Sequence, residues 1–187
     1  KQLAAGITGF KCATLRELEM ALDAGAQEAI LAYPMVQQLK VDRFAQIADA
    51  HSNARVYATA GDTSHVEALA VAAAGRERPL LVMLDLDVGM HRTGASGGAA
   101  EAIYSAIHNT SGLEVAGLHA YDGHEHFQDP QGRAGAAQKH INDLRALKAQ
   151  LEAAGMPVPR VVAGGSFSFA YYARTEGFHG SPGTVVY

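Results

Sequence analysis

The chain has 187 residues, with 15 Lys or Arg against 19 Asp or Glu, and a formal net charge of −4 when its nine His are counted as neutral. Hydrophobic residues make up 48% of the sequence, which excludes a disordered chain, and the acidic balance without a basic run argues against nucleic acid as a partner. A single cysteine, Cys12, excludes an internal disulfide, and no apolar stretch approaches the roughly 18 residues that span a membrane, so we expect a cytoplasmic protein with no membrane partner.

Short apolar runs alternate with amphipathic segments, and the length indicates one domain over residues 1–187. Thr14 and Glu17 have the spacing of a capping box, which predicts that a helix begins after the first run. In chain order, the predicted strands are 9–14, 29–34, 55–60, 80–88, 115–121, 160–163 and 184–187. The predicted helices are 15–24, 41–51, 64–74, 99–108 and 135–154.

Strands that alternate with helices run parallel, because each helix carries the chain back across the sheet. Two architectures fit this order, a doubly wound sheet and a (β/α)8 barrel of the TIM type. A barrel needs eight strands and about 250 residues, whereas this α/β pattern contains seven predicted strands and stops inside the last. We therefore expect an incomplete barrel that lacks the first strand and whatever follows residue 187.

Polar residues gather just beyond the apolar runs, at the carboxyl ends of the strands, where both architectures bind ligands. Two of these groups combine glycine with a hydroxyl side chain: Gly164-Gly165-Ser166 after the sixth run and Gly183-Thr184 at the start of the seventh. Glycine lets backbone N–H groups approach an anion, and the hydroxyl adds a donor. The two groups predict a phosphate site, and ordinary tight turns are the alternative.

The segment 87–94 (DVGMHRTG) follows the fourth run. Arg92 lies between two glycines of this loop, where a tightly turned backbone would hold its guanidinium in place. Such a donor fork suits a carboxylate, a phosphate or a phenolate oxygen. A surface ion pair is the alternative interpretation of Arg92.

The fifth run leads into a histidine-rich segment. Tyr121 at its end is a candidate for contact with a ligand, and a core aromatic residue is the alternative. A metal site for Zn²⁺ or Fe²⁺, and with it a metal-dependent hydrolase, is conceivable from four residues of this segment: Asp122, His124, His126 and Asp129.

Five stretches of the sequence occur in an order typical of one enzyme family: 2–13 (QLAAGITGFKCA), 87–94 (DVGMHRTG), 117–124 (GLHAYDGH), 164–166 (GGS) and 181–187 (SPGTVVY). They resemble the D-threonine aldolase and D-serine dehydratase-like family, fold-type III pyridoxal-phosphate enzymes related to alanine racemase. The resemblance implies a cofactor-binding barrel followed by a smaller β domain. It also implies a Schiff-base lysine upstream of this chain and divalent-metal ligands in the β domain, outside this chain.

The resemblance assigns roles to residues of this chain. Tyr121 takes the position that packs against the face of the cofactor ring, and Arg92 takes a position near the phenolic oxygen and the substrate. Ser181 takes the place of an arginine that contacts the pyridine nitrogen in alanine racemase, and is a neutral partner there. The implied phosphate cradle consists of Gly164, Gly165, Ser166, Gly183 and Thr184.

These roles imply a lyase that acts on a β-hydroxy D-amino acid, by aldol cleavage or by dehydration, with a metal polarising the hydroxyl. His124, two residues past Asp122, is the candidate for proton transfer, and a supporting role is the alternative. The alternatives for the whole protein are a barrel that binds pyridoxal phosphate without turnover and the metal-dependent hydrolase. We expect a homodimer, and we expect the 187-residue chain alone to be inactive.

Overall fold

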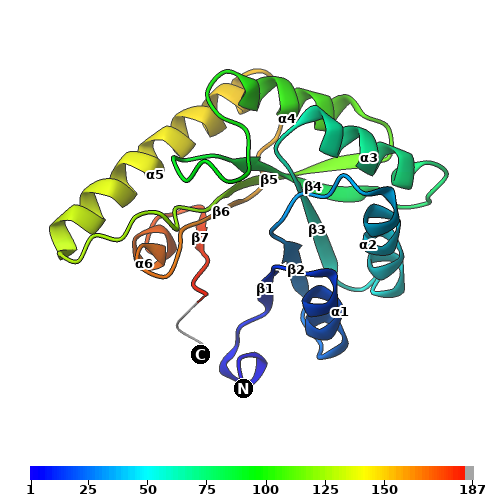
Figure 1. Cartoon of the computed structure of the whole chain (residues 1–187), viewed down its shortest axis with the longest axis horizontal. Coiled ribbons are helices and arrows are strands. Elements are labelled where there is room, and N and C mark those ends of the chain that lie inside the picture. Colours follow the sequence, from blue (N-terminus) through cyan, green and yellow to red (C-terminus); the bar gives the residue numbers. More distant parts are fainter. Residues whose placement is uncertain (184–187) are drawn as a thin grey trace.

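A computed structural model describes residues 1–183 (Figure 1). Its described strands form one parallel sheet in which each strand pairs with the next along the chain. The strands are β1 (Gly9–Cys12), β2 (Glu28–Leu31), β3 (Arg55–Ala60), β4 (Leu80–Leu86), β5 (Leu113–Ala120), β6 (Val161–Ala163) and β7 (Phe178–Gly180). The helices are the 3-10 turn η1 (Leu3–Ala5), α1 (Leu15–Asp23), α2 (Gln38–Ala50), α3 (Thr63–Ala73), α4 (Ala99–Asn109), α5 (Pro130–Ala153) and α6 (Phe169–Ala173).

The sheet is strongly curved, and Figure 1 shows α1 to α5 along its outer, convex side with β1 and β7 at its two open ends. Eight such strands would close a TIM barrel. The seven described strands therefore form most of a barrel, and the predicted incomplete (β/α)8 barrel is confirmed. None of the helices that the structure describes combines the length and apolar character that crossing a membrane requires.

Side-chain caps explain where several helices begin. The predicted capping box is present, because the Thr14 hydroxyl accepts from the Glu17 N–H while the Glu17 carboxylate accepts from the Thr14 N–H. Helix α5 begins at Pro130, five residues before its predicted start, because Asp129 caps it by accepting from the Gly132 N–H at 2.6 Å. Proline is well suited to the first position of a helix, because its backbone nitrogen carries no N–H to be left unpaired there.

The carboxy-terminal part differs from the prediction. The sequence pattern missed α6 and β7, because five and three residues are too few to show a period. The predicted strand 184–187 lies outside the described residues. Ser181 and Gly183 consequently follow the described strand β7, where the prediction had placed them before a seventh strand.

Buried side chains form two layers on either side of the sheet. The larger cluster lies between the sheet and the outer helices and includes Leu18, Phe44 and Ile107. A second cluster fills the concave side with one residue from each of β2 to β6: Ile30, Tyr57, Met83, Ala116 and Val162. At the amino ends of the strands, Glu28 and Arg160 form an ion pair across the concave side. The interior is therefore solid at this end, and the site must lie at the other.

Candidate functional site

Polar side chains from three strands lie on the concave side beyond the apolar layer. Asp85 is two residues past Met83 in β4, so both point to the same face, and His119 is its partner in register on β5. Lys11 on β1 is the register partner of Ile30 and also belongs to this face. The sequence analysis missed Lys11 and the pairing of Asp85 with His119, since only strand register brings these residues together.

Asp85 and His119 form a buried pair, with His119 Nδ1 2.7 Å from Asp85 Oδ1. Burial lowers the pKa of His119, against the opposing effect of the Asp85 hydrogen bond, so the ring is neutral near pH 7. Nδ1 therefore donates to the carboxylate, and Nε2 carries the lone pair. Within residues 1–183, His119 Nε2 and Asp85 Oδ2 are both buried without a hydrogen-bond partner. Two acceptor atoms are thus available to a donor that enters the barrel.

Tyr121 directly follows β5 and lies between cationic groups. Lys11 Nζ is 4.7 Å from the centre of its ring and the Arg92 guanidinium is 5.0 Å away. Arg92 is also 4.7 Å from the ring of Tyr33. Burial lowers the pKa of Lys11 to about 8, although Asp122 and Asp85 nearby oppose this shift. The mouth of the barrel therefore combines an aromatic face with two positive groups, a pairing suited to an anionic aromatic ligand.

The loop that carries Arg92 is held by its own hydrogen bonds. Asp87 Oδ1 accepts from the N–H groups of Gly89 and His91, both at 2.9 Å, and His91 Nδ1 is 2.8 Å from Asp87 Oδ2. A Cβ on Gly94 would lie 2.6 Å from the Asp87 backbone nitrogen, so glycine is required there. The loop borders a small depression lined by Asp85, Asp87, Met90, Arg92, Thr93 and Tyr121. The predicted rigid setting of Arg92 agrees with this geometry.

The two predicted glycine corners lie together. The Gly183 N–H donates to Ser166 Oγ at 3.3 Å, which joins the segment after β6 to the segment after β7. Beside them, a Cβ on Gly165 would be 3.3 Å from the Tyr121 ring, and one on Gly183 would meet no atom of the described residues within 4 Å. Ser181 Oγ is buried and has no partner in the described part of the chain. Thr184, also predicted here, lies outside the described residues.

A network of hydrogen bonds supports this corner from behind. The Ser168 hydroxyl accepts from the Gly165 N–H at 3.0 Å and donates to Asp122 Oδ1 at 2.7 Å, and the Tyr172 hydroxyl donates to Asp122 Oδ2 at 2.9 Å. Asp122 therefore has a positioning role between the ends of β5 and β6. Gly164 has φ +95°, and a Cβ there would lie 2.7 Å from the Tyr172 ring, so this position also requires glycine.

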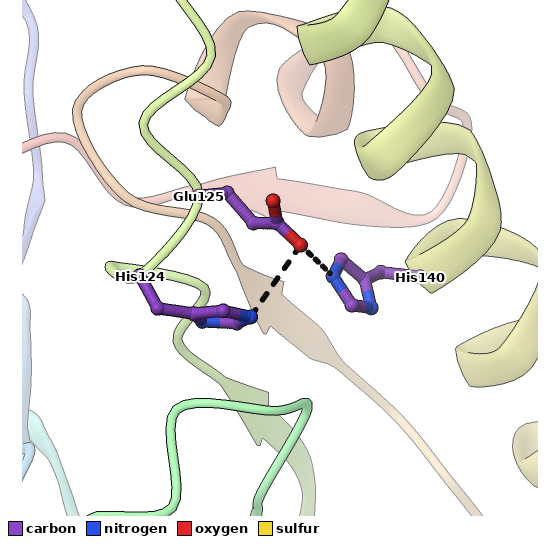
Figure 2. A group of neighbouring side chains, drawn as sticks. All are labelled: His124, Glu125 and His140. Carbon is purple, nitrogen blue, oxygen red and sulfur yellow. Dashed lines mark hydrogen bonds and ion pairs between the residues drawn. The ribbon is translucent and has the colours of Figure 1, made fainter.

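His124 lies with Glu125 and His140 (Figure 2). Its Nε2 is 3.4 Å from Glu125 Oε1, and His140 Nε2 from α5 is 3.3 Å from the same oxygen. His126 is exposed, and its ring packs edge-on against Phe167 at 5.6 Å. With Asp122 bound to Ser168 and Tyr172, and Asp129 capping α5, the structure does not assemble the predicted metal set of these four residues.

Comparison with known proteins gives matches over most of the chain. The sequence model of the alanine racemase N-terminal domain matches residues 1–187. Two uncharacterized proteins, Mb1448 of Mycobacterium bovis and Rv1413 of Mycobacterium tuberculosis, are each 31% identical over 169 residues, which cover 88% of this chain and 93% of the relative.

Solved structures share the fold. D-threonine aldolase from Filomicrobium marinum is 27% identical with a TM-score of 0.87, covering 100% of this chain and 50% of its own. D-threo-3-hydroxyaspartate dehydratase from Delftia sp. HT23 is 23% identical with a TM-score of 0.75, covering 97% and 48%. Alanine racemase from Corynebacterium glutamicum is 21% identical with a TM-score of 0.68, covering 98% and 48%. The chain spans about half the length of each of these three proteins.

Proposed function

The chain belongs to the alanine racemase N-terminal-domain family, and from this membership we propose that it is the cofactor-binding barrel of a pyridoxal-phosphate enzyme. The family is the one that its motifs resemble, so the resemblance to fold-type III enzymes is confirmed. We further propose that the whole protein acts on a β-hydroxy D-amino acid, by aldol cleavage or dehydration. The observation that carries the proposal is the meeting of the Ser166 and Gly183 corners beside Tyr121.

The residues at the barrel mouth fit this cofactor. Its phosphate needs several donors in a small space, and we propose that the Ser166 hydroxyl and the Gly183 N–H, which now donates to it, turn toward the phosphate. The N–H groups of Gly164 and Gly165 donate to the Ala120 carbonyl and to Ser168 Oγ, so these two glycines shape the corner by having no Cβ. The open space at Gly183 leaves room for the phosphate oxygens. The Ser181 hydroxyl has no partner among the described residues, so it can form a hydrogen bond with the pyridine nitrogen of the cofactor as a neutral partner. Thr184 is proposed as a further donor.

Bound pyridoxal phosphate supplies an electron-withdrawing ring that stabilises negative charge on the α-carbon of an amino acid. In this chain, Tyr121 would pack against the ring, and Arg92 would direct its donors toward the phenolic oxygen or the substrate. Lys11 adds positive charge at the same edge of the site. The buried pair Asp85 and His119 would present the acceptors Asp85 Oδ2 and His119 Nε2 to a bound ligand.

We propose His124 as the residue that moves a proton at the β-hydroxyl. Its Nε2 faces Glu125 Oε1, which orients the ring, and its Nδ1 is buried without a partner among the described residues. A neutral imidazole has one nitrogen that accepts a proton and one that donates, which is what this role requires. The imine-forming lysine and the ligands of an activating divalent metal are proposed to lie outside this chain, and the homodimer and cytoplasmic location stay predictions.

The cofactor proposal can be tested by binding alone. We expect the purified 187-residue chain to bind pyridoxal phosphate, measured by isothermal titration, and inorganic phosphate to compete with it. Because a hydrogen bond to a charged group contributes about 1.5–3 kcal/mol, Ser166→Ala should weaken binding at least about tenfold. Ser105→Ala on the outer helix α4 is the matched control and should bind as the wild type does. Equal affinity of the two variants, or the absence of competition by phosphate, would contradict the proposal.

A second function is favoured by one comparison. The two mycobacterial relatives are matched over 93% of their length, so proteins of about this extent exist in the family. For such a protein the proposal reduces to a barrel that binds pyridoxal phosphate without turnover. Assays of the whole protein with D-threonine and D-serine separate the two, since release of aldehyde or ammonia requires an enzyme.

A further inference from the structure

Three side chains beside the barrel mouth come close enough to share an ion. His124 and Glu125 lie in the segment that follows β5, and His140 projects toward them from α5 (Figure 2). One ligand atom of each lies within 4.8 Å of the other two. His140 is buried, and His124 and Glu125 are half-buried. We infer that these three residues form a binding site for a divalent cation, with Zn²⁺ as the best match.

The distances in this cluster differ from those of ordinary histidine–carboxylate pairs in the same molecule. The pairs His51–Asp23, His91–Asp87 and His119–Asp85 have N···O distances of 3.0, 2.8 and 2.7 Å, as expected for hydrogen bonds. Glu125 Oε1 is instead 3.4 Å from His124 Nε2 and 3.3 Å from His140 Nε2. In a tetrahedral zinc site with Zn–N and Zn–O bonds of about 2.0–2.1 Å, neighbouring ligand atoms are about 3.3–3.4 Å apart. Both separations therefore match the edges of a coordination tetrahedron.

The donor set also suits zinc. Two imidazole nitrogens and one carboxylate oxygen are the ligands of a common class of zinc site, which keeps its fourth position open for water or a substrate oxygen. One carboxylate between two imidazoles gives a net charge that a divalent cation can balance.

The surroundings show what a bound ion would hold in place. Tyr121 and Asp122 lie two to three residues before His124 in the segment that follows β5, so the ion would tie this segment to α5. His124 also packs on Gly89 of the Arg92 loop, where a Cβ would come within 2.9 Å of Nε2. The site thus borders the proposed cofactor pocket on the side of Arg92 and Tyr121. Its existence does not depend on the proposed function, and the metal-ligand role replaces the proton-transfer role proposed for His124, because a ring coordinated at Nε2 has no lone pair left to accept a proton.

Titration with Zn²⁺ alone tests the inference. We expect the metal-stripped 187-residue chain to bind one Zn²⁺ and to gain thermal stability from it. Loss of a direct ligand should exceed the 10- to 100-fold effect typical of outer-shell changes, so Glu125→Gln and His140→Gln should each weaken binding by more than about 100-fold. His126→Gln, two residues from His124 in the same segment, is the matched control and should keep wild-type affinity. Bound Co²⁺ should show the visible absorption of four-coordinate cobalt in the wild type and the control, and lose it in Glu125→Gln.

Glu125→Gln is the deciding variant, because it preserves shape and removes only the charge, whereas replacing the buried His140 can disturb folding. Its circular dichroism spectrum should match that of the wild type. The inference is overturned if the wild type does not bind Zn²⁺, if Glu125→Gln keeps its affinity, or if His126→Gln loses as much as Glu125→Gln. Pyridoxal phosphate is absent from these measurements, so their outcome is separate from that of the cofactor proposal.

Discussion

Replacing Lys11 with Met is expected to stabilise the fold at neutral pH. The Lys11 ammonium extends from β1 to the concave side of the sheet, with Nζ 4.7 Å from the centre of the Tyr121 ring. In residues 1–183 it makes no hydrogen bond or ion pair with another side chain. Methionine has a similar length and no charge, so it can fill the same space without the cost of desolvating a cation.

The size of the effect follows from the pKa. Burial lowers the pKa of Lys11 from its ordinary value of 10.5 to about 8. Since one pKa unit corresponds to about 1.4 kcal/mol, keeping the buried amine charged at pH 7 costs about 3 kcal/mol relative to the unfolded chain. Between pH 8 and 10.5 the unfolded state binds more protons than the folded state, so the wild type gains stability as pH rises through this window. The advantage of Lys11→Met should therefore be about 3 kcal/mol at pH 7 and disappear above about pH 10.5.

Urea unfolding followed by circular dichroism at pH 7 and at about pH 10 measures this difference. Lys40→Met on the exposed face of α2 is the control, and it should change the free energy of unfolding by less than about 0.5 kcal/mol at either pH. A Lys11→Met variant that is less stable than the wild type at pH 7, or whose gain is the same at both pH values, would refute the reasoning. Retention of so costly a cation is typical of a functional site.

Two further predictions concern the fold. Gly117→Ala should lower the free energy of unfolding by more than about 3 kcal/mol in urea titrations, because φ is +125° and the new Cβ would lie 1.9 Å from the Arg160 carbonyl oxygen. Gly135→Ala on α5 is the control: its new Cβ would meet no described atom within 4 Å, and it should add about 0.5–1 kcal/mol. Similar urea midpoints for the two variants would argue against the clash at Gly117. Burial lowers the pKa of His119, so the contribution of this residue to stability should be constant above about pH 6.5 and fall below it as the unfolded chain takes up a proton. His119→Gln should make the fall in stability below about pH 6.5 less steep, and identical pH profiles in that range would show that His119 is not its cause.

The long elements could be predicted from the sequence because burial dictates their composition. Strand β3 was predicted at 55–60 and is found at Arg55–Ala60, since a run buried on both faces is continuously apolar and is bounded by polar residues. Strand β7 could not be found in this way, because Phe178–Gly180 contains one histidine, one glycine and one buried side chain. It is defined by backbone pairing with β6, which no local pattern encodes.

Some residues of the candidate site could likewise be predicted from the sequence, and others could not. Tyr121, Ser166 and Gly183 could be proposed because they lie just beyond strand ends, and a parallel barrel collects such positions at one end. Lys11 and His140 could not be proposed from the sequence, because each lies inside a strand or helix and reaches the site only through its side chain. Their signal is a polar residue on a face that is otherwise apolar, which becomes visible once register assigns the faces.

The polar groups on the concave side of the sheet differ in their hydrogen-bond pairing between the two ends of the strands. At the amino ends of the strands, Glu28 and Arg160 satisfy each other across the interior. Six buried side-chain atoms lack hydrogen-bond partners within the described residues, and four of them lie at the carboxyl ends of the strands: Asp85 Oδ2, His119 Nε2, His124 Nδ1 and Ser181 Oγ. The other two are Arg76 Nε, before β4, and Arg133 Nε, in α5.

Each buried unpaired polar atom costs about 1–3 kcal/mol, so stability does not explain why four of the six lie around the candidate site. A ligand that supplies partners to these atoms recovers part of that cost only when it is bound. Ligand affinity and the stability of the fold are then linked. Among ligands compared at equal concentration, the one that forms the most of these hydrogen bonds should raise the free energy of unfolding most.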